Sequence, residues 1–306
     1  MGEGKTGPFG AHWANGNIVV NPSVSPGTNF YVDSNSGAST NSGLTWRDPM
    51  ATIDQAVNKC TASNGDIVWV HPSHAEDLAA DSAIDVDLAG VAIRGIRHGR
   101  LMPTVNNTAA DGDFKLAAAG TSVENIRFTG GVDIGTGILE ISSTDCAIIN
   151  CEFRDVTGQA TDVIMGVDGA DRLLIDGWRH FGSASAGANS AIALNGCDDV
   201  EVRNFEIYGD FAVAAIDFRT TLSARVWVHD GTIWTINAAD IGVKDTVTSS
   251  TGAIGPNVNM MLLENAANIT NSVTGATFHV LGVNKIANLV NEQGIQLNWT
   301  ASTSGA

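Results

Sequence analysis

A repeat with a period near 25 residues runs through the middle of the chain, and it constrains the fold more than any other feature. In five successive segments an Asn or Asp follows an apolar stretch, at spacings of 25, 26, 28 and 26 residues. An apolar or glycine residue usually comes next, then a polar residue, then another apolar one. The repeating residues are Asn125, Asn150, Asp176, Asn204 and Asp230.

A second set of apolar residues recurs with the same period, at spacings of 26, 27, 24 and 25 residues. Its members are Ile141, Val167, Leu194, Phe218 and Val243. Two strand-like columns with one shared period predict a solenoid in which each short coil stacks on the previous one at about 4.8 Å. The expected fold class is therefore all-β, a parallel β-helix solenoid.

The pattern around the repeating Asn or Asp predicts which side chains face the core. An Asn or Asp at a bend tolerates the left-handed backbone conformation and bonds to its equivalent in the next coil. The coil at Asp176 departs from the pattern, since Trp178 stands at the polar position, and we expect a bulge or an insertion there. The predicted inward residues are Ile126, Phe128, Cys151, Phe153, Phe205, Ile207, Gly231 and Ile233, and the predicted outward ones are Arg127, Glu152, Glu206 and Thr232.

The ends of the chain differ from its middle. Residues 49–60 place Ile53, Ala56, Val57 and Cys60 at helical spacing, with Asp48 as the expected N-cap, so a short helix is predicted to cover the first coil. We expect an extended N-terminal arm over 1–28, a strand, loop and helix cap over 29–64, coils over 65–256, and a C-terminal cap or oligomer contact over 257–306.

Residues 29–78 resemble the entry module of right-handed parallel β-helix proteins, the pectate-lyase-like superfamily. The matching elements are a Tyr-Val-Asp strand, a Gly/Asn-rich loop, a Pro-x-Ala-Thr-Ile helix and a Gly-Asp strand that ends in proline. In this sequence they are Tyr31-Val32-Asp33, Asn41 and Gly43, Pro49, Ala51-Thr52-Ile53, Gly65-Asp66, Val70 and Pro72, followed by VAIRG at 91–95. The resemblance implies the fold but not one activity, because the superfamily includes lyases, hydrolases, tailspikes and inert virion proteins.

Composition excludes several functional classes. The 33 acidic and 16 basic residues give a formal net charge of −17, and only five lysines are present, so no nucleic-acid partner is expected. No apolar run is long enough to span a membrane, and the N-terminus lacks the apolar segment of a secretory signal. Without any C-x-x-C pair, the four cysteines are predicted to be small buried residues, although a Cys146–Cys151 disulfide stays open.

One pair of carboxylates has the spacing of a hydrolytic site. Glu152 and Glu206 lie two coils apart, about 9.5 Å at the stacking distance, and Trp178 is expected between them. Inverting glycosidases hold two carboxylates about 6.5–9.5 Å apart. The alternative is a solvated face on which Arg127 pairs with Glu152, and it is the interpretation we adopt.

The other polar candidates carry weaker signals. A cation site at Asp162, Asp168 and Asp171 competes with plain turn formation, and His71 and His74 form a metal pair without a third ligand. Val226–Asp230 is faintly similar to a pectate-lyase motif with His and Asp swapped, and the hydrolase motifs of the superfamily are absent. The histidines His98, His180, His229 and His279 are scattered along the sequence and suggest no catalytic triad. We therefore assign no catalytic, cofactor-binding or metal-binding residue and expect no cofactor.

The resemblance to virion β-helices, together with the arm and the missing motifs, predicts a non-enzymatic structural protein of a phage or virus particle. It would be a capsid decoration protein or a short fibre or spike, made in the host cytoplasm and located in the virion. Expected partners are a capsid or tail protein held by the arm and two further copies in a homotrimer, with a surface glycan as a further candidate. The alternatives are a polysaccharide-degrading or glycan-binding spike, and a carbohydrate-binding or S-layer-like module without catalysis.

Overall fold

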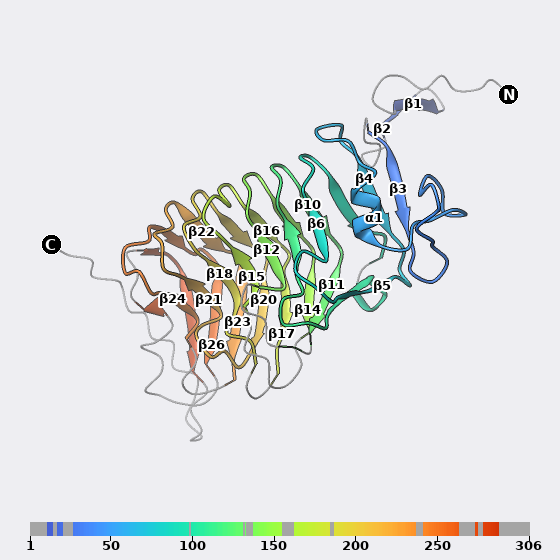
Figure 1. Ribbon diagram of the computed structural model, residues 1–306. Coiled ribbons are helices and arrows are strands. Elements are labelled where there is room, and N and C mark those ends of the chain that lie inside the picture. Colours follow the sequence, from blue (N-terminus) through green and yellow to red (C-terminus); the bar gives the residue numbers. More distant parts are fainter. Residues whose placement is uncertain are drawn as a thin grey trace.

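The chain winds into a parallel β-solenoid, which Figure 1 shows as a rod. The computed structural model describes residues 11–14, 17–20, 27–97, 99–130, 132, 137–154, 162–183, 187–236, 241–262, 273–274 and 278–287. Three strands in each coil contribute to three sheets of ten, nine and eight strands. The predicted fold class is confirmed: strands dominate, and the described part has one five-residue α-helix and one short 3₁₀ helix, η1 (Gly99–Leu101).

We number the sheets by their order in each coil. Sheet 1 contains β3 (Asn29–Val32), β4 (Ile67–Val70), β7 (Ala92–Gly95), β10 (Ser122–Glu124), β13 (Ala147–Ile149), β16 (Leu174–Asp176), β19 (Glu201–Arg203), β22 (Val226–His229), β25 (Gly252–Ile254) and β28 (His279–Val280). Sheet 2 contains β5 (Ala75–Leu78), β8 (Thr104–Asn107), β11 (Arg127–Gly130), β14 (Glu152–Arg154), β17 (Arg179–Phe181), β20 (Glu206–Gly209), β23 (Gly231–Thr235), β26 (Val258–Leu262) and β29 (Val283–Ala287). Sheet 3 contains β6 (Ile84–Val86), β9 (Phe114–Leu116), β12 (Leu139–Ile141), β15 (Asp162–Gly166), β18 (Ser190–Leu194), β21 (Ile216–Phe218), β24 (Val243–Asp245) and β27 (Val273–Thr274).

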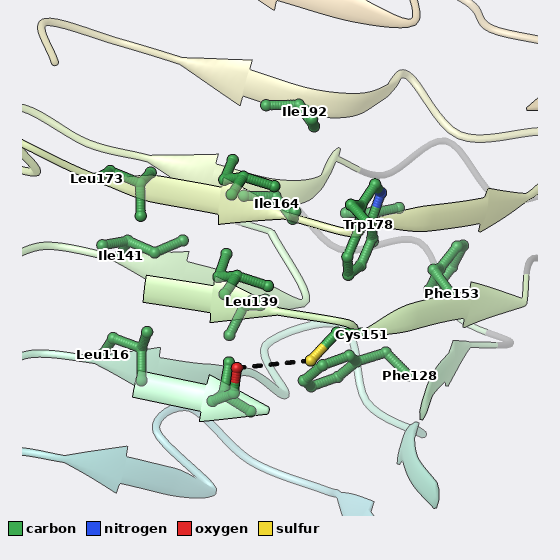
Figure 2. Close-up of a cluster of buried hydrophobic side chains, with 14 of the residues drawn as sticks. Leu116, Phe128, Leu139, Ile141, Cys151, Phe153, Ile164, Leu173, Trp178 and Ile192 are labelled. Atoms are coloured by element: carbon green, nitrogen blue, oxygen red, sulfur yellow. Dashed lines mark hydrogen bonds between the residues drawn. The ribbon is translucent and has the colours of Figure 1, made fainter. Parts of the chain in front are cut away.

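Apolar side chains from all three sheets fill the interior of the rod. Alternate strand residues point inward, so each inward position stacks on its equivalent in the next coil. Figure 2 shows this packing in the central coils, with Leu139, Ile164 and Ile192 stacked from β12, β15 and β18. The side chains predicted to face inward beside the repeating Asn or Asp are buried, apart from half-buried Gly231.

The coil at Trp178 keeps its register, which corrects the predicted bulge. Asp176 ends β16 in register with Ile149 and Arg203, and Gly177 takes the left-handed corner that Asn150 and Asn204 occupy in neighbouring coils. Trp178 therefore points into the core and is fully buried (Figure 2). The mistaken alignment arose because Asp176 resembles the corner residues chemically, while glycine adopts this conformation without any side-chain signal.

Replacing Gly177 by alanine is expected to lower the free energy of unfolding by about 1–2 kcal/mol from left-handed backbone strain alone. Overlap adds to this, because a Cβ at Gly177 would lie 2.4 Å from Asn150 Oδ1. The matched control is Gly169→Ala, which also has a positive φ but nothing within 4 Å of the added carbon. The free energy of unfolding of both variants is measured by urea denaturation. An equal decrease in Gly177→Ala and Gly169→Ala would contradict the predicted overlap.

The second apolar column also needs correction at two coils. Ile141, Leu194 and Phe218 share one inward position, but Gly166 fills it in the coil of Val167. In the coil of Val243 the partner of Phe218 is Asp245. Regular spacing along the sequence tolerates such shifts of one or two residues, because the corner turns vary in length between coils.

The N-terminal helix lies where the pattern placed it but is shorter. Helix α1 (Ile53–Val57) packs Ile53, Ala56 and Val57 against β3, β4 and β6 at the start of the solenoid. Its N-cap is Thr52 rather than Asp48, which instead accepts hydrogen bonds from Ser42. Met50 forms a β-bridge with Val32 and therefore holds the segment before Thr52 outside the helix.

Parallel pairing continues past residue 256, where the sequence placed the end of the coils. Strands β26 to β29 extend all three sheets as far as Ala287. Of the predicted arm, the structure describes an antiparallel pair, β1 (Ala11–Ala14) and β2 (Asn17–Val20), and residues 27–28. The rest of the predicted arm and of the C-terminal region lies outside the described residues.

Candidate functional site

The outer face of sheet 2 carries two columns of side chains that point away from the core. In the first column, which we call the charged column, register pairs align Arg127, Glu152, Arg179 and Glu206. The second column stands two residues further along each strand and contains Arg154, Phe181, Tyr208 and Trp234. Because every coil contributes one residue to each column, both columns run along the axis of the rod.

The two glutamates of the predicted pair have different environments. Glu206 is exposed, whereas Glu152 is only 2% exposed and accepts hydrogen bonds from Arg127 Nε at 2.8 Å and Arg154 Nε at 2.7 Å. Arg179, not Trp178, stands between them. The predicted pairing of Arg127 with Glu152 is therefore present, but on a buried carboxylate rather than on a solvated face, and the two glutamates do not face a shared open space.

Three aromatic residues on consecutive coils, Phe181, Tyr208 and Trp234, form what we call the aromatic stripe. Trp234 is 38% exposed, and its ring centroid lies 5.9 Å from that of Tyr208 in a nearly perpendicular arrangement. The guanidinium of Arg154 lies 4.0 Å from the centre of the Phe181 ring. The stripe is thus an apolar surface bordered by arginines and the carboxylate of Glu206.

Sequence reasoning missed the stripe, although its signal was present. Phe181, Tyr208 and Trp234 each follow a corner residue by four positions, counted from Gly177, Asn204 and Asp230. Counting from Asp176 instead put Phe181 out of phase with the other two. The single alignment error therefore concealed the aromatic column and moved a buried tryptophan into the expected site.

A second polar cluster lies on the outer face of sheet 1. The imidazole of His229 contacts Asp230 Oδ2 at 2.6 Å and Glu201 Oε1 at 3.0 Å, and it stacks on Trp227 at 3.9 Å. Hydrogen bonds with His229 and Arg203 hold the pKa of Glu201 below its usual value against the effect of desolvation, and hydrogen bonds from Asn257 and His229 lower the pKa of Asp230. A general acid needs a raised pKa, so this cluster has the chemistry of a fixed ionic network.

The predicted cation site at Asp162, Asp168 and Asp171 does not assemble. Asp162 is buried and binds the guanidinium of Arg219, which also binds Asp217. Asp171 accepts a hydrogen bond from the backbone N–H of Asp198, while Asp168 is exposed. No group of three His, Cys, Asp or Glu side chains suited to a metal ion occurs within the described ranges.

The histidines and cysteines to which sequence analysis assigned no functional role lie in different structural environments. His71 contacts Ser73, while buried His74 accepts a hydrogen bond from Ser34 N and contacts Glu76 at 2.9 Å. His180 is buried, His279 is exposed, and His98 lies outside the described residues. All four cysteines are free, so no Cys146–Cys151 disulfide forms, and burial raises the pKa of the Cys60, Cys151 and Cys197 thiols to about 12.

Comparison with known proteins supports the architecture. Neither a protein-family model nor a curated protein matches the chain. A solved structure of a GH136 lacto-N-biosidase from Eubacterium ramulus superposes with a TM-score of 0.56 at 11% identity, covering 86% of this chain. The likeness shows the fold. The chain spans 56% of the length of that enzyme. A structure of a rhamnogalacturonan lyase is also similar, with a TM-score of 0.48 and 12% identity. The similarity covers 78% of this chain and 75% of the lyase. No helix in the described residues is long and apolar enough to cross a membrane.

Proposed function

We propose that this protein binds carbohydrate chains along the outer face of sheet 2, with the chain parallel to the axis of the rod. The observation that carries the proposal is the aromatic stripe, three rings from three consecutive coils on the outer face of the sheet, with Trp234 exposed and Phe181 and Tyr208 half-buried. A sugar ring stacks its C–H face on an aromatic ring, and its hydroxyl groups meet polar side chains at the edge. Arg154, Arg179 and Glu206 supply such donors and acceptors beside the stripe.

The comparison supports the same ligand class. The GH136 structure is named as a lacto-N-biosidase, an enzyme that acts on a glycan. Binding rather than hydrolysis is the activity we propose for this face, because glycosidases use two accessible carboxylates and Glu152 is buried under two arginines. Of the functions expected from the sequence, the glycan-binding alternative thus has support, whereas the virion role, the homotrimer and attachment by the arm stay predictions.

Titration with a panel of lacto-N-biose, cellohexaose, chitohexaose, xylohexaose and hexagalacturonate tests the proposal. Trp234→Ala and Tyr208→Ala are each expected to weaken binding by about 5–30-fold, since a central aromatic contact is worth roughly 1–2 kcal/mol. The matched control is Trp227→Ala, which removes a tryptophan that is 45% exposed on sheet 1. The proposal would be overturned if Trp234→Ala and Trp227→Ala lost equal affinity for the sugar, or if both stripe variants bound it as tightly as wild type.

A further inference from the structure

Three aromatic rings gather on the outer face of sheet 1 at the N-terminal end of the rod. Tyr31 on β3 and Trp46 in the following loop have ring centroids 4.6 Å apart, and Trp46 meets the ring of His71 at 5.4 Å. Trp46 is 38% exposed, and the His71 side chain is 41% exposed. We call these three residues the N-terminal aromatic cluster.

The cluster combines apolar ring faces with free polar atoms. Within the described part of the chain, no hydrogen bond is formed by Tyr31 Oη, Trp46 Nε1 or His71 Nε2. The other nitrogen of His71 contacts Ser73 Oγ at 2.6 Å, and that hydroxyl donates to Asp33 at 3.3 Å, so the imidazole is held in one orientation. Flat apolar faces with polar tips at their edges match a sugar ring, which has a C–H face and a rim of hydroxyls.

The loop that carries Trp46 is already ordered by its own hydrogen bonds. Tyr31 N donates to Gly43 O at 2.8 Å, Met50 N donates to Tyr31 O at 2.9 Å, and Asp48 N donates to Thr45 O at 3.0 Å. The Asp48 carboxylate accepts two hydrogen bonds from Ser42, which lower its pKa. A platform fixed before binding loses less conformational entropy when a ligand arrives.

The cluster and the aromatic stripe lie on different sheets and far apart along the rod. Tyr31 belongs to the terminal strand of sheet 1, and the coils of the stripe are five to seven strands further along that sheet. At the usual spacing between strands this is about 25–35 Å along the axis. A ligand bound along the stripe follows the outer face of sheet 2, whereas the cluster lies on the outer face of sheet 1, so each place would hold its own ligand.

We propose that the N-terminal aromatic cluster is a second carbohydrate-binding site, and that the protein bridges two glycan chains. The ligand class rests on the function proposed for the stripe, whereas the position of the site rests on the cluster itself. Two sites on one rigid rod would cross-link soluble polysaccharide and bind a glycan-coated surface far more tightly than either site alone.

The test measures how many sugar molecules one protein binds and whether the protein aggregates beads. The oligosaccharides of the panel above are titrated calorimetrically into the full chain, and beads coupled to the same oligosaccharides report bridging. Trp46→Ala is expected to lower the stoichiometry from two to one and to abolish bead aggregation while binding at the stripe persists. Leu44→Ala is the matched control, because it removes a side chain that is 53% exposed from the same loop.

The outcomes separate this inference from the proposed function. Trp234→Ala is also expected to leave a stoichiometry of one, with only the N-terminal site occupied. A wild-type stoichiometry of one that Trp46→Ala does not change would overturn the second site and leave the stripe intact. If Trp46→Ala abolished all binding and Trp234→Ala left binding unchanged, the stripe would be overturned instead. If no sugar of the panel bound to the wild type, both proposals would be overturned.

Discussion

Replacement of Arg219 by alanine is expected to lower the free energy of unfolding by about 3–5 kcal/mol, the usual cost of removing one partner from a buried ion pair. The Arg219 guanidinium binds both oxygens of Asp162, one at 2.6 Å, and contacts Asp217 Oδ2 at 2.5 Å. The two aspartates are only 3% and 1% exposed. Without the guanidinium, two carboxylates would remain in a desolvated site that already raises the pKa of Asp162.

The measurement is urea denaturation, with Arg225→Ala as the matched control. Arg225 also joins two aspartates of the preceding coil, Asp198 and Asp199, but its side chain is 61% exposed. Exposed pairs contribute little because water screens them, so the control is expected to unfold close to wild type. Equal destabilisation of the two variants would contradict this account, as would failure of the combined change Arg219→Met, Asp162→Asn and Asp217→Asn to recover stability.

Acid is expected to destabilise the protein through His180. This residue is fully buried, its ring centroid lies 5.1 Å from that of Phe153 and 5.2 Å from that of Phe211, and neither ring nitrogen has a hydrogen-bond partner within the described residues. Burial lowers the pKa of His180 from 6.5 to about 3. Below pH 6.5 the unfolded chain therefore binds a proton that the folded chain does not, and stability falls by up to about 1.4 kcal/mol per pH unit until pH 3.

The effect is measured by comparing the free energy of unfolding of the wild type with that of His180→Phe as a function of pH. The variant keeps an aromatic ring in the buried column that contains Phe128 and Phe153. The wild type is expected to lose about 4–5 kcal/mol more than the variant between pH 6.5 and pH 3. At neutral pH the variant is expected to be more stable by about 1–3 kcal/mol, because it no longer buries unpaired polar atoms. The control is His279→Phe, a change at an exposed position, which should leave the pH dependence of the free energy of unfolding as in wild type. The same pH dependence in wild type and His180→Phe would contradict the prediction.

The amino-acid pattern was sufficient for the fold because the period and the alternation are local properties. Side chains such as Phe128, Ile148 and Ile207 face inward since alternate residues of a strand point to opposite faces. Regular spacing then places equivalent residues above one another. The parallel coils and the buried columns followed from these two rules, except where Gly166 and Asp245 take the position expected for Val167 and Val243. The position of the capping helix followed from the helical spacing of apolar residues over 49–60.

The candidate site could not be predicted in the same way. Alignment of Phe181 with Tyr208 and Trp234 depends on Gly177 taking the corner, a choice made by backbone conformation rather than by side-chain chemistry. The N-terminal aromatic cluster depends on a loop that returns Trp46 to the face of Tyr31. The contact of Trp46 with Tyr31 joins residues that no strand period relates. The stripe does follow the coil period, but taking Asp176 as the corner residue hid it.

The sequence by itself determined that this protein is a stack of short parallel strands, and which side of each strand is apolar. Tertiary structure alone decided the register between coils, and with it the neighbours of each outward side chain. The physical reason is that facing is set within a strand, whereas register is set by the corner turns and by stacking on the adjacent coil. Because Gly177 rather than Asp176 takes the corner, Trp178 is buried, Arg179 stands between the two glutamates, and Phe181 aligns with the other rings of the aromatic stripe.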